Sequence, residues 1–261
     1  MHKNKIISIA TIAILLSIFP SFPVHDANAA SMIFTVNTTI NTSQTIGPGE
    51  TWTINSGVTL TISPGVIIDS NAGTINNNGV IDNHGTIDNN GIISNSDTIN
   101  NFNDGTILNE FSIFNNGGIN NDGTIKNFST INNSVNINNN GIIDNFDTFI
   151  NNLTATVFND GHISNSLGAT FTNNGGITNN GGIENASGAA FNNNVGINNS
   201  GSITNSATFS NSGTITNFGA TISNPAGSIS NSLGGTFYNN GTIINSGTVI
   251  NNGGGIITNS G

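Results

Sequence analysis

A large apolar residue, most often Ile or Phe, recurs about every six residues along most of the chain, and the positions between are small or polar. Counting from Ile75 to Ile257 gives 29 of these apolar anchors, and each is followed two positions later by Asn. Of the 28 gaps between anchors, 20 are six residues long, two are seven and six are eight. A short repeat kept over such a length is the signature of a solenoid, in which each repeat packs only on its neighbours.

One cassette of the repeat reads small residue, variable, anchor, variable, Asn, variable, as in Gly-Thr-Ile-Asn-Asn-Asn at 73–78. Alternation over its first positions predicts a short strand that carries the small residue and the anchor on one face. One large apolar residue in six does not form the stripe of an amphipathic helix. We therefore predict an all-β fold, a parallel β-solenoid (β-helix), with three cassettes in a triangular coil of about 18 residues.

Each cassette position has an expected role. The small residue leaves room where the walls of the coil converge, and the longer gaps are longer turns at all three corners. Asn suits a turn because it tolerates left-handed backbone, and stacked Asn side chains can bond to one another along the axis. The expected core stack begins with Ile75, Ile81, Ile87, Ile93 and Ile99. The expected Asn ladder begins with Asn77, Asn83, Asn89, Asn95 and Asn101.

The chain divides into three parts. Residues 1–29 have a basic start, an apolar stretch at 6–19 and Ala-Asn-Ala at 27–29, which predicts a secretory signal peptide. Residues 30–72 contain the only Trp, Trp52, and turn sequences such as Gly-Pro-Gly, and we expect an N-terminal cap and irregular first coils there. Residues 73–261 carry the regular repeats.

The amino-acid composition limits the classes of partner that the protein is expected to bind. Only 6% of residues are charged, and there is no Arg and no Cys. After removal of the signal peptide, 12 acidic residues face one lysine, Lys126. Nucleic acid and an anionic membrane surface are therefore not expected partners, because both need clustered Lys or Arg. No later apolar run is long enough for a transmembrane segment in the mature chain.

The repeats at 73–79 and 213–217 resemble those of secreted β-helical surface proteins, above all filamentous-haemagglutinin-like adhesins and autotransporter passengers. The resemblance covers about residues 40–261 and implies a parallel β-helix displayed at the cell surface, in adhesion or matrix building. The sequence departs from those families in showing no C-terminal membrane barrel, sorting signal or secretion domain. The six-residue period is also similar to that of hexapeptide-repeat acyltransferases, but their His-bearing active-site loop has no counterpart here.

Residues that carry chemistry are sparse. His84 and His162 are 78 residues apart and occupy different cassette positions, which favours solvated surface over a metal pair. Asp82 and Asp88 occupy equivalent positions in consecutive cassettes, so we expect them on different faces rather than paired as in a hydrolase. We expect no catalytic residues, cofactor or metal site. Several Asn-x-Ser/Thr triplets permit glycosylation, among them those at Asn37, Asn41, Asn127, Asn132, Asn152, Asn185 and Asn198.

One face has a regular row of hydroxyl residues. In every third cassette from Ile75, the residue before the anchor is Thr or Ser in eight of ten cases, and Ile92 and Ala190 interrupt the row. A flat Thr column of this kind could bind ice, although Thr also has high strand propensity. The column comprises Thr74, Thr130, Thr148, Thr170, Thr208 and Thr248, with Ser112 and Ser228.

These observations predict a secreted, non-enzymatic structural or adhesive protein of the cell surface or extracellular matrix. The repeat continues to Gly261 without a change in composition, which predicts an open coil end that can add another copy, head to tail or laterally. The expected partners are the protein itself and surface polysaccharide. The alternative is a binding module that uses a flat face for ice or polysaccharide.

Overall fold

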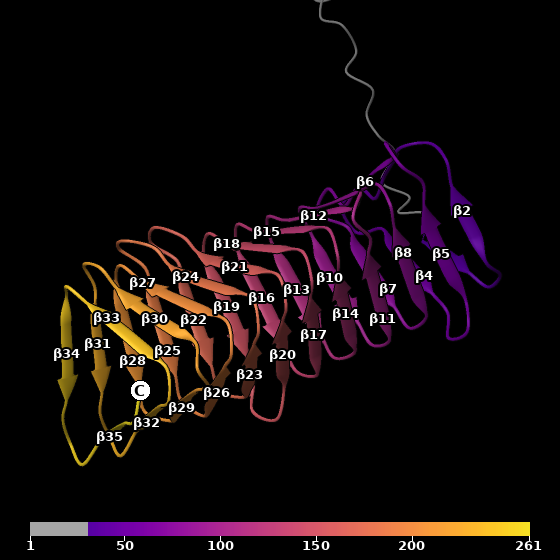
Figure 1. Cartoon of the computed structure of the whole chain (residues 1–261). Coiled ribbons are helices and arrows are strands. Elements are labelled where there is room, and N and C mark those ends of the chain that lie inside the picture. The colour runs from indigo at the N-terminus through magenta and orange to yellow at the C-terminus, as the bar shows by residue number, and fades with distance from the viewer. Residues whose placement is uncertain (1–30) are drawn as a thin grey trace, which may run out of the picture.

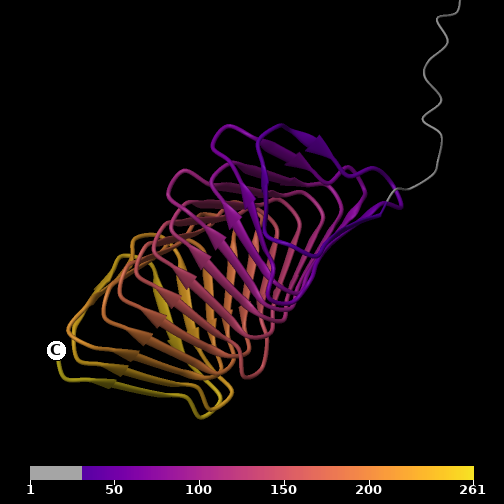
Figure 2. The same ribbon diagram turned by 90° about the vertical axis from the view of Figure 1, so that its right-hand side faces the viewer.

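Each cassette forms one short strand, and three successive strands make one turn of a three-sided coil (Figures 1 and 2). The computed structural model describes residues 31–261, so the predicted signal peptide at 1–29 lies outside the described residues. Within the described part, the regular secondary structure consists of β-strands, and these strands form three parallel sheets along the coil. The predicted all-β parallel solenoid is confirmed.

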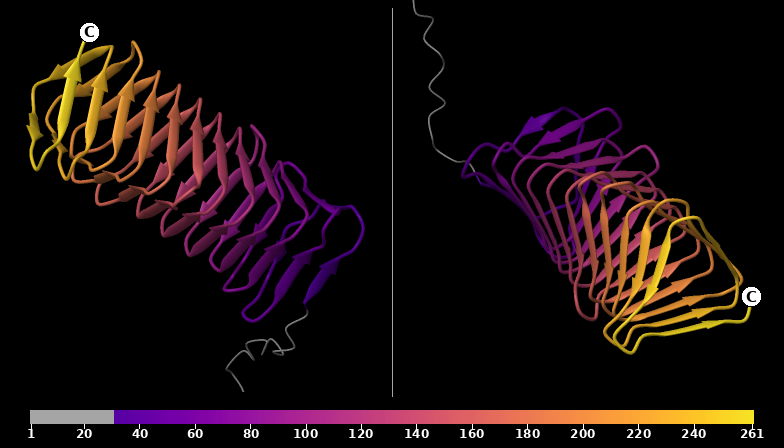
Figure 3. Two further views of the ribbon diagram at one scale, coloured as in Figure 1. Left: turned by 90° about the horizontal axis from the view of Figure 1, so that it is seen from below. Right: turned by 90° about the vertical axis from the view of Figure 1, so that its left-hand side faces the viewer.

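Every third strand belongs to the same sheet, so each sheet is one wall of the coil (Figure 3). Sheet A contains β1 (Met32–Phe34), β4 (Thr51–Ile54), β7 (Thr74–Asn77), β10 (Ile92–Asn95), β13 (Ser112–Asn115), β16 (Thr130–Asn133), β19 (Thr148–Asn151), β22 (Thr170–Asn173), β25 (Ala190–Asn193), β28 (Thr208–Asn211), β31 (Ser228–Asn231) and β34 (Thr248–Asn251). Sheet B contains β2 (Thr38–Ile40), β5 (Thr59–Ile62), β8 (Val80–Asn83), β11 (Thr98–Asn101), β14 (Gly118–Asn121), β17 (Asn136–Asn139), β20 (Thr156–Asn159), β23 (Gly176–Asn179), β26 (Gly196–Asn199), β29 (Thr214–Asn217), β32 (Thr236–Asn239) and β35 (Ile256–Asn259). Sheet C contains β3 (Gln44–Thr45), β6 (Ile67–Asp69), β9 (Thr86–Asn89), β12 (Thr106–Asn109), β15 (Thr124–Asn127), β18 (Ile142–Asn145), β21 (His162–Asn165), β24 (Gly182–Asn185), β27 (Ser202–Asn205), β30 (Thr221–Asn224) and β33 (Thr242–Asn245).

The strands of successive turns pair in register, so equivalent cassette positions lie directly above one another. Asn77 and Asn95 are 18 residues apart, the length expected for three cassettes. Asn151 and Asn173 are 22 residues apart because two corners between them carry insertions. With neighbouring strands about 4.8 Å apart, the solenoid is a rod about 50 Å long.

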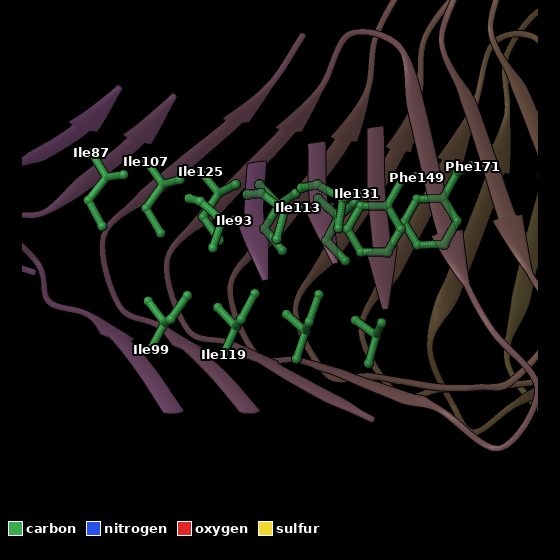
Figure 4. Packing of buried hydrophobic residues seen from close by; sticks show 14 of the residues in the cluster. Ile87, Ile93, Ile99, Ile107, Ile113, Ile119, Ile125, Ile131, Phe149 and Phe171 are labelled. Atoms are coloured by element: carbon green, nitrogen blue, oxygen red, sulfur yellow. The ribbon is translucent and has the colours of Figure 1, made fainter. Parts of the chain in front are cut away.

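The anchors fill the interior in three rows, one for each sheet (Figure 4). Side chains of the expected core stack are at most 2% exposed. Those residues are Ile75, Ile81, Ile87, Ile93 and Ile99. In sheet A the row continues into stacked phenyl rings, whose centroids lie 4.4 Å apart for Phe149 and Phe171 and 4.7 Å apart for Phe171 and Phe191. The rings stack because the spacing between turns is close to the contact distance of parallel aromatic rings.

The small residue before each strand lies close to the backbone of the preceding turn, a contact that the sequence did not predict. A Cβ atom at Gly117 would overlap the backbone carbonyl oxygen of Asp97, one turn below. At Gly117, therefore, the side chain is limited by the backbone of the preceding turn rather than by the apolar core. Ala155, Ala169 and Ala189 stand at the same cassette position and are buried. Five bulkier residues at this position are exposed: Asp97, Phe111, Val135, Asp147 and Val195.

Residues 31–72, for which we predicted a cap and irregular first coils, form β1 to β6 and join the same three sheets. In sheet A these strands bury an apolar side chain at the position that Asn occupies later: Phe34 and Ile54 precede Asn77. In sheet C the buried residue that precedes Asn89 is Ser70. Trp52 occupies the anchor position beside Ile54 and meets Phe34 edge-on, with ring centroids 5.3 Å apart. The first turns are thus more apolar than the rest. Among residues 31–261, no helix could cross a lipid bilayer.

Candidate binding surfaces

The second inward position of each regular strand carries an Asn, and these side chains form three continuous hydrogen-bonded ladders. Each Nδ2 donates to the Oδ1 of the Asn one turn closer to the C-terminus, over 2.6 to 2.9 Å, and all these side chains up to Asn239 are at most 2% exposed. The ladders run from Asn77 to Asn251 in sheet A, Asn83 to Asn259 in sheet B and Asn89 to Asn245 in sheet C. They contain the predicted members Asn77, Asn83, Asn89, Asn95 and Asn101.

The other N–H of the ladder amide is also bound. In Asn77, for example, Nδ2 reaches the backbone carbonyl of Thr98 in the next turn at 2.8 Å. Buried amides need such partners, because an unpaired N–H or carbonyl away from water costs about 1–3 kcal/mol. The ladders therefore hold consecutive turns together, and their amides are not free for a ligand. One atom is left over: Asn89 Oδ1, at the start of the sheet C ladder, has no partner.

The outer face of sheet A carries the predicted Thr column in register. Thr74, Thr130, Thr148, Thr170, Thr208 and Thr248 all lie in this sheet, together with Ile92, Ser112, Ala190 and Ser228. The neighbouring outward column is mixed and includes Phe114, Ile150 and Ile250. The hydroxyl row is thus a single column bordered by side chains of different sizes.

The outer face of sheet B carries a second row of hydrogen-bonded amides. Nδ2 of Asn100 donates to Asp82 Oδ1, Nδ2 of Asn120 to Asn100 Oδ1, and Nδ2 of Asn138 to Asn120 Oδ1, each at 2.8 Å. The next residue in register is Phe158, which has no donor, so the row ends there. We call these four residues from Asp82 to Asn138 the outer amide row.

A parallel row of side chains lies two residues further along the chain in each turn, just after the strand ends, at the corner between sheets B and C. It contains Phe102, Asp122, Asn140 and Asp160. Asn140 Nδ2 donates to Asp122 Oδ1 at 2.8 Å. Between the two rows lies an open hollow of about 690 Å³, which we call the B–C furrow. Its lining residues are Asn100, Phe102, Asn120, Asp122, Asn138, Asn140, Phe158 and Asp160.

The histidines have partners that the sequence did not reveal. His84 stacks on Phe102 with ring centroids 4.2 Å apart, and its Nδ1 lies 3.0 Å from Asp104 Oδ1. His162 Nε2 lies 3.9 Å from a carboxylate oxygen of Glu184 on sheet C. His84 therefore helps to hold the ring of Phe102 at one end of the furrow. In the described range 31–261, no three His, Asp or Glu side chains are grouped closely enough to share a metal ion.

The carboxylates of consecutive cassettes lie on different walls, as expected: Asp82 is on sheet B and Asp88 on sheet C. Asp88 lies in register with Asp69 of the preceding turn. Burial raises the pKa of Asp88, and the charges of Glu110 and Asp69 raise it further, while a hydrogen bond from Asn90 opposes the shift. Two carboxylates stacked one turn apart repel each other along the sheet.

The structure separates the glycosylation triplets named above by access. Asn127 and Asn185 are buried members of the sheet C ladder, so a glycan on either would require the ladder to open. Asn37, Asn41 and Asn198 are exposed.

Counting every third cassette from Ile75 revealed the Thr column, but the same count from Ile81 would have revealed the outer amide row. It returns Asp82, Asn100, Asn120 and Asn138 as four consecutive residues after the anchor. The corner row could have been found in the same way, because Phe102, Asp122, Asn140 and Asp160 each lie three residues after an anchor of the same series.

No protein family model, curated protein or solved structure matches this chain.

Proposed function

We propose that this protein is a secreted, non-enzymatic structural or adhesive component of the cell surface or extracellular matrix. The observation that carries the proposal is the continuity of the three Asn ladders, which join every turn from β7 onward through buried amides. Because the ladders join each turn to the next, the chain forms a stiff rod that presents similar outward-facing residue positions at every turn. Such a rod suits the display of a long surface or the spacing of other components.

Two sequence features support the location and the role. The predicted signal peptide at 1–29 supports export. The resemblance of the repeats to those of filamentous-haemagglutinin-like adhesins and autotransporter passengers supports adhesion or matrix building.

Self-association is part of the proposal. Apolar rings stand on the outside of the rod, and Phe128 and Phe146 stack on each other with centroids 4.8 Å apart while remaining 45% and 41% exposed. Exposed apolar side chains arranged along a rod favour lateral contact between copies.

Fractionation of the cells that produce the protein tests the location. We expect the protein in the medium or on the cell surface, with an N-terminus near Ser31 by sequencing. Recovery from the cytoplasm with residues 1–29 still attached would contradict the proposal. For self-association, light scattering and negative-stain microscopy of purified residues 31–261 should show fibres or bundles, whereas monodisperse single rods at high concentration would contradict that part.

The second candidate function is a flat-face binding module for ice, and the in-register Thr column of sheet A supports it. A thermal-hysteresis assay tests it directly. Replacement of Thr130 by Val and of Thr148 by Tyr should abolish any thermal-hysteresis activity, because the large tyrosine ring would disrupt the flat column.

A further inference from the structure

We propose that the B–C furrow binds a neutral polysaccharide, with the chain of hexopyranose units lying parallel to the solenoid axis. The furrow joins fixed amides, carboxylates and aromatic rings over four successive turns, and it is lined by one residue of each outward row from β11, β14, β17 and β20.

The amides are held in one orientation before any ligand arrives. An Asn side chain has two N–H donors and an oxygen with two lone pairs. In Asn120, the outer amide row uses one N–H toward Asn100 and one lone pair toward Asn138. One N–H donor and one lone pair on the oxygen remain, and a sugar hydroxyl can pair with both because it donates one hydrogen bond and accepts another. Fixed groups lose little entropy on binding.

The carboxylates add acceptors on the opposite side of the furrow. Asp122 and Asp160 are exposed, and each accepts one hydrogen bond from an Asn of the next turn, at 2.8 and 2.7 Å. Each carboxylate has further lone pairs for hydroxyl donors.

Aromatic rings stand at the two ends of the furrow. Phe158 is 45% exposed and ends the outer amide row, and Phe102 is held by its stack with His84. A ring of this kind offers a flat apolar surface to the C–H face of a pyranose. The furrow thus offers hydrogen-bonding groups in its middle and apolar rings at its ends. A sugar chain has both hydroxyl groups and apolar C–H faces to pair with them.

The repeat of the furrow suits a polymer. Its four turns span about 14 Å at about 4.8 Å per turn, and a hexopyranose unit is of similar length to one turn. About three sugar units would therefore span the furrow, with one unit for each step from turn to turn.

The charges decide between neutral and acidic polymers. The furrow contains Asp122 and Asp160. Lys126, the one lysine in the described range, lies in β15 of sheet C. Carboxylates without a facing cation repel uronic acids and sulfated sugars, so a neutral chain is favoured.

The inference deepens the proposed function by giving the surface protein a ligand class, but its test does not depend on location or self-association. Isothermal titration calorimetry of purified residues 31–261 with cellotetraose, β-1,4-mannotetraose and tetragalacturonate is the experiment. We expect at least one neutral tetrasaccharide to bind with a dissociation constant of about 0.1–1 mM, because hydroxyl groups exchange water for protein partners. Tetragalacturonate should bind at least about tenfold more weakly.

Two variants locate the site. Phe158→Ala and Asn120→Ala should each weaken binding about tenfold, because they remove a ring and break the outer amide row. Phe114→Ala is the matched control: Phe114 follows the anchor of its strand as Phe158 does and is 40% exposed, but it lies on sheet A. It should leave binding unchanged. Circular dichroism checks that each variant remains folded.

The inference is overturned if neither neutral tetrasaccharide shows saturable binding, if tetragalacturonate binds as tightly, or if Phe158→Ala and Phe114→Ala weaken binding equally. Binding by a protein that stays monomeric would support the furrow and contradict self-association, so the two proposals fail separately.

Discussion

Asn100 and Asn101 are neighbours in β11, yet their side-chain amides donate hydrogen bonds in opposite directions along the solenoid axis. Asn101 Nδ2 donates to Asn121, toward the C-terminus, and Asn100 Nδ2 donates to Asp82, toward the N-terminus. The outer direction follows from Asp82, because an ionised carboxylate only accepts. The inner direction follows from the backbone, because most of the buried amides also reach a carbonyl of the next turn, as Asn101 reaches Thr124. One residue type thus serves two separate networks.

The inner ladder should contribute much more to stability than the outer row. Asn121→Ala leaves Asn101 Nδ2 and Asn139 Oδ1 without their ladder partner in a buried site. We expect a loss of about 2–5 kcal/mol, since each unpaired buried group costs about 1–3 kcal/mol. Asn120→Ala, the adjacent outward residue, is the control and should cost less than about 1 kcal/mol. Urea unfolding followed by circular dichroism measures both, and equal losses would refute the structural role of the ladder.

Glycine at the corner should be irreplaceable at one position and dispensable at the next. A Cβ at Gly117 would overlap the carbonyl oxygen of Asp97, whereas a Cβ at Gly118 would have that atom as its nearest neighbour, at 4.0 Å. We expect Gly117→Ala to destabilise the protein by about 1–3 kcal/mol, the usual cost of overpacking. Gly118→Ala should be close to neutral. The pair can be compared by thermal melting, and similar melting temperatures would contradict the backbone contact.

The aromatic part of the core should tolerate a change of shape better than a loss of volume. Phe171 is fully buried between Phe149 and Phe191. Phe171→Ala should cost about 3–5 kcal/mol because it leaves a cavity that the neighbouring rings cannot fill. Phe171→Ile should cost less, since Ile occupies the anchor position in most other cassettes of the chain. The measurement is urea unfolding, and an alanine variant as stable as the isoleucine variant would show that the turns collapse to fill the space.

The stacked carboxylates of sheet C should make stability depend on pH. Because the pKa of Asp88 is raised in the folded protein, its ionised form is less favourable there than in the unfolded chain. The penalty is absent below the ordinary pKa of 3.8 and develops as the pH rises through the raised value. Asp88→Asn should therefore raise the melting temperature at pH 7 and lose that advantage below pH 3.8.

Asp144→Asn is the control for the preceding prediction. Asp144 occupies the same cassette position on sheet C but lies in register with Lys126 rather than with another acid. It should give no gain in melting temperature at pH 7. An equal gain in both variants would mean that overall net charge sets the effect, and not the burial of Asp88 and its acidic neighbours Glu110 and Asp69.

The six-residue period by itself determined the fold, the buried anchors and the three-cassette turn. A constant spacing between Ile75, Ile81 and Ile87 can bury each of them only if the chain winds regularly, and the Asn two positions later must then stack on its equivalents. The resemblance in the repeats pointed to the same architecture. These features are local in sequence, so a single cassette contains the information for them.

Only the tertiary structure decided how the outward rows form a hollow and which backbone atoms approach one another. Phe102 and Phe158 are 56 residues apart in the sequence, and they line one furrow because the corners carry insertions of just the lengths that keep β11, β14, β17 and β20 in register. The need for Gly117 likewise arises from the carbonyl of Asp97 in another turn. Contacts between turns depend on the accumulated path of the whole coil, which the cassette pattern does not specify, whereas the inward or outward direction of a side chain depends only on the period of its own strand.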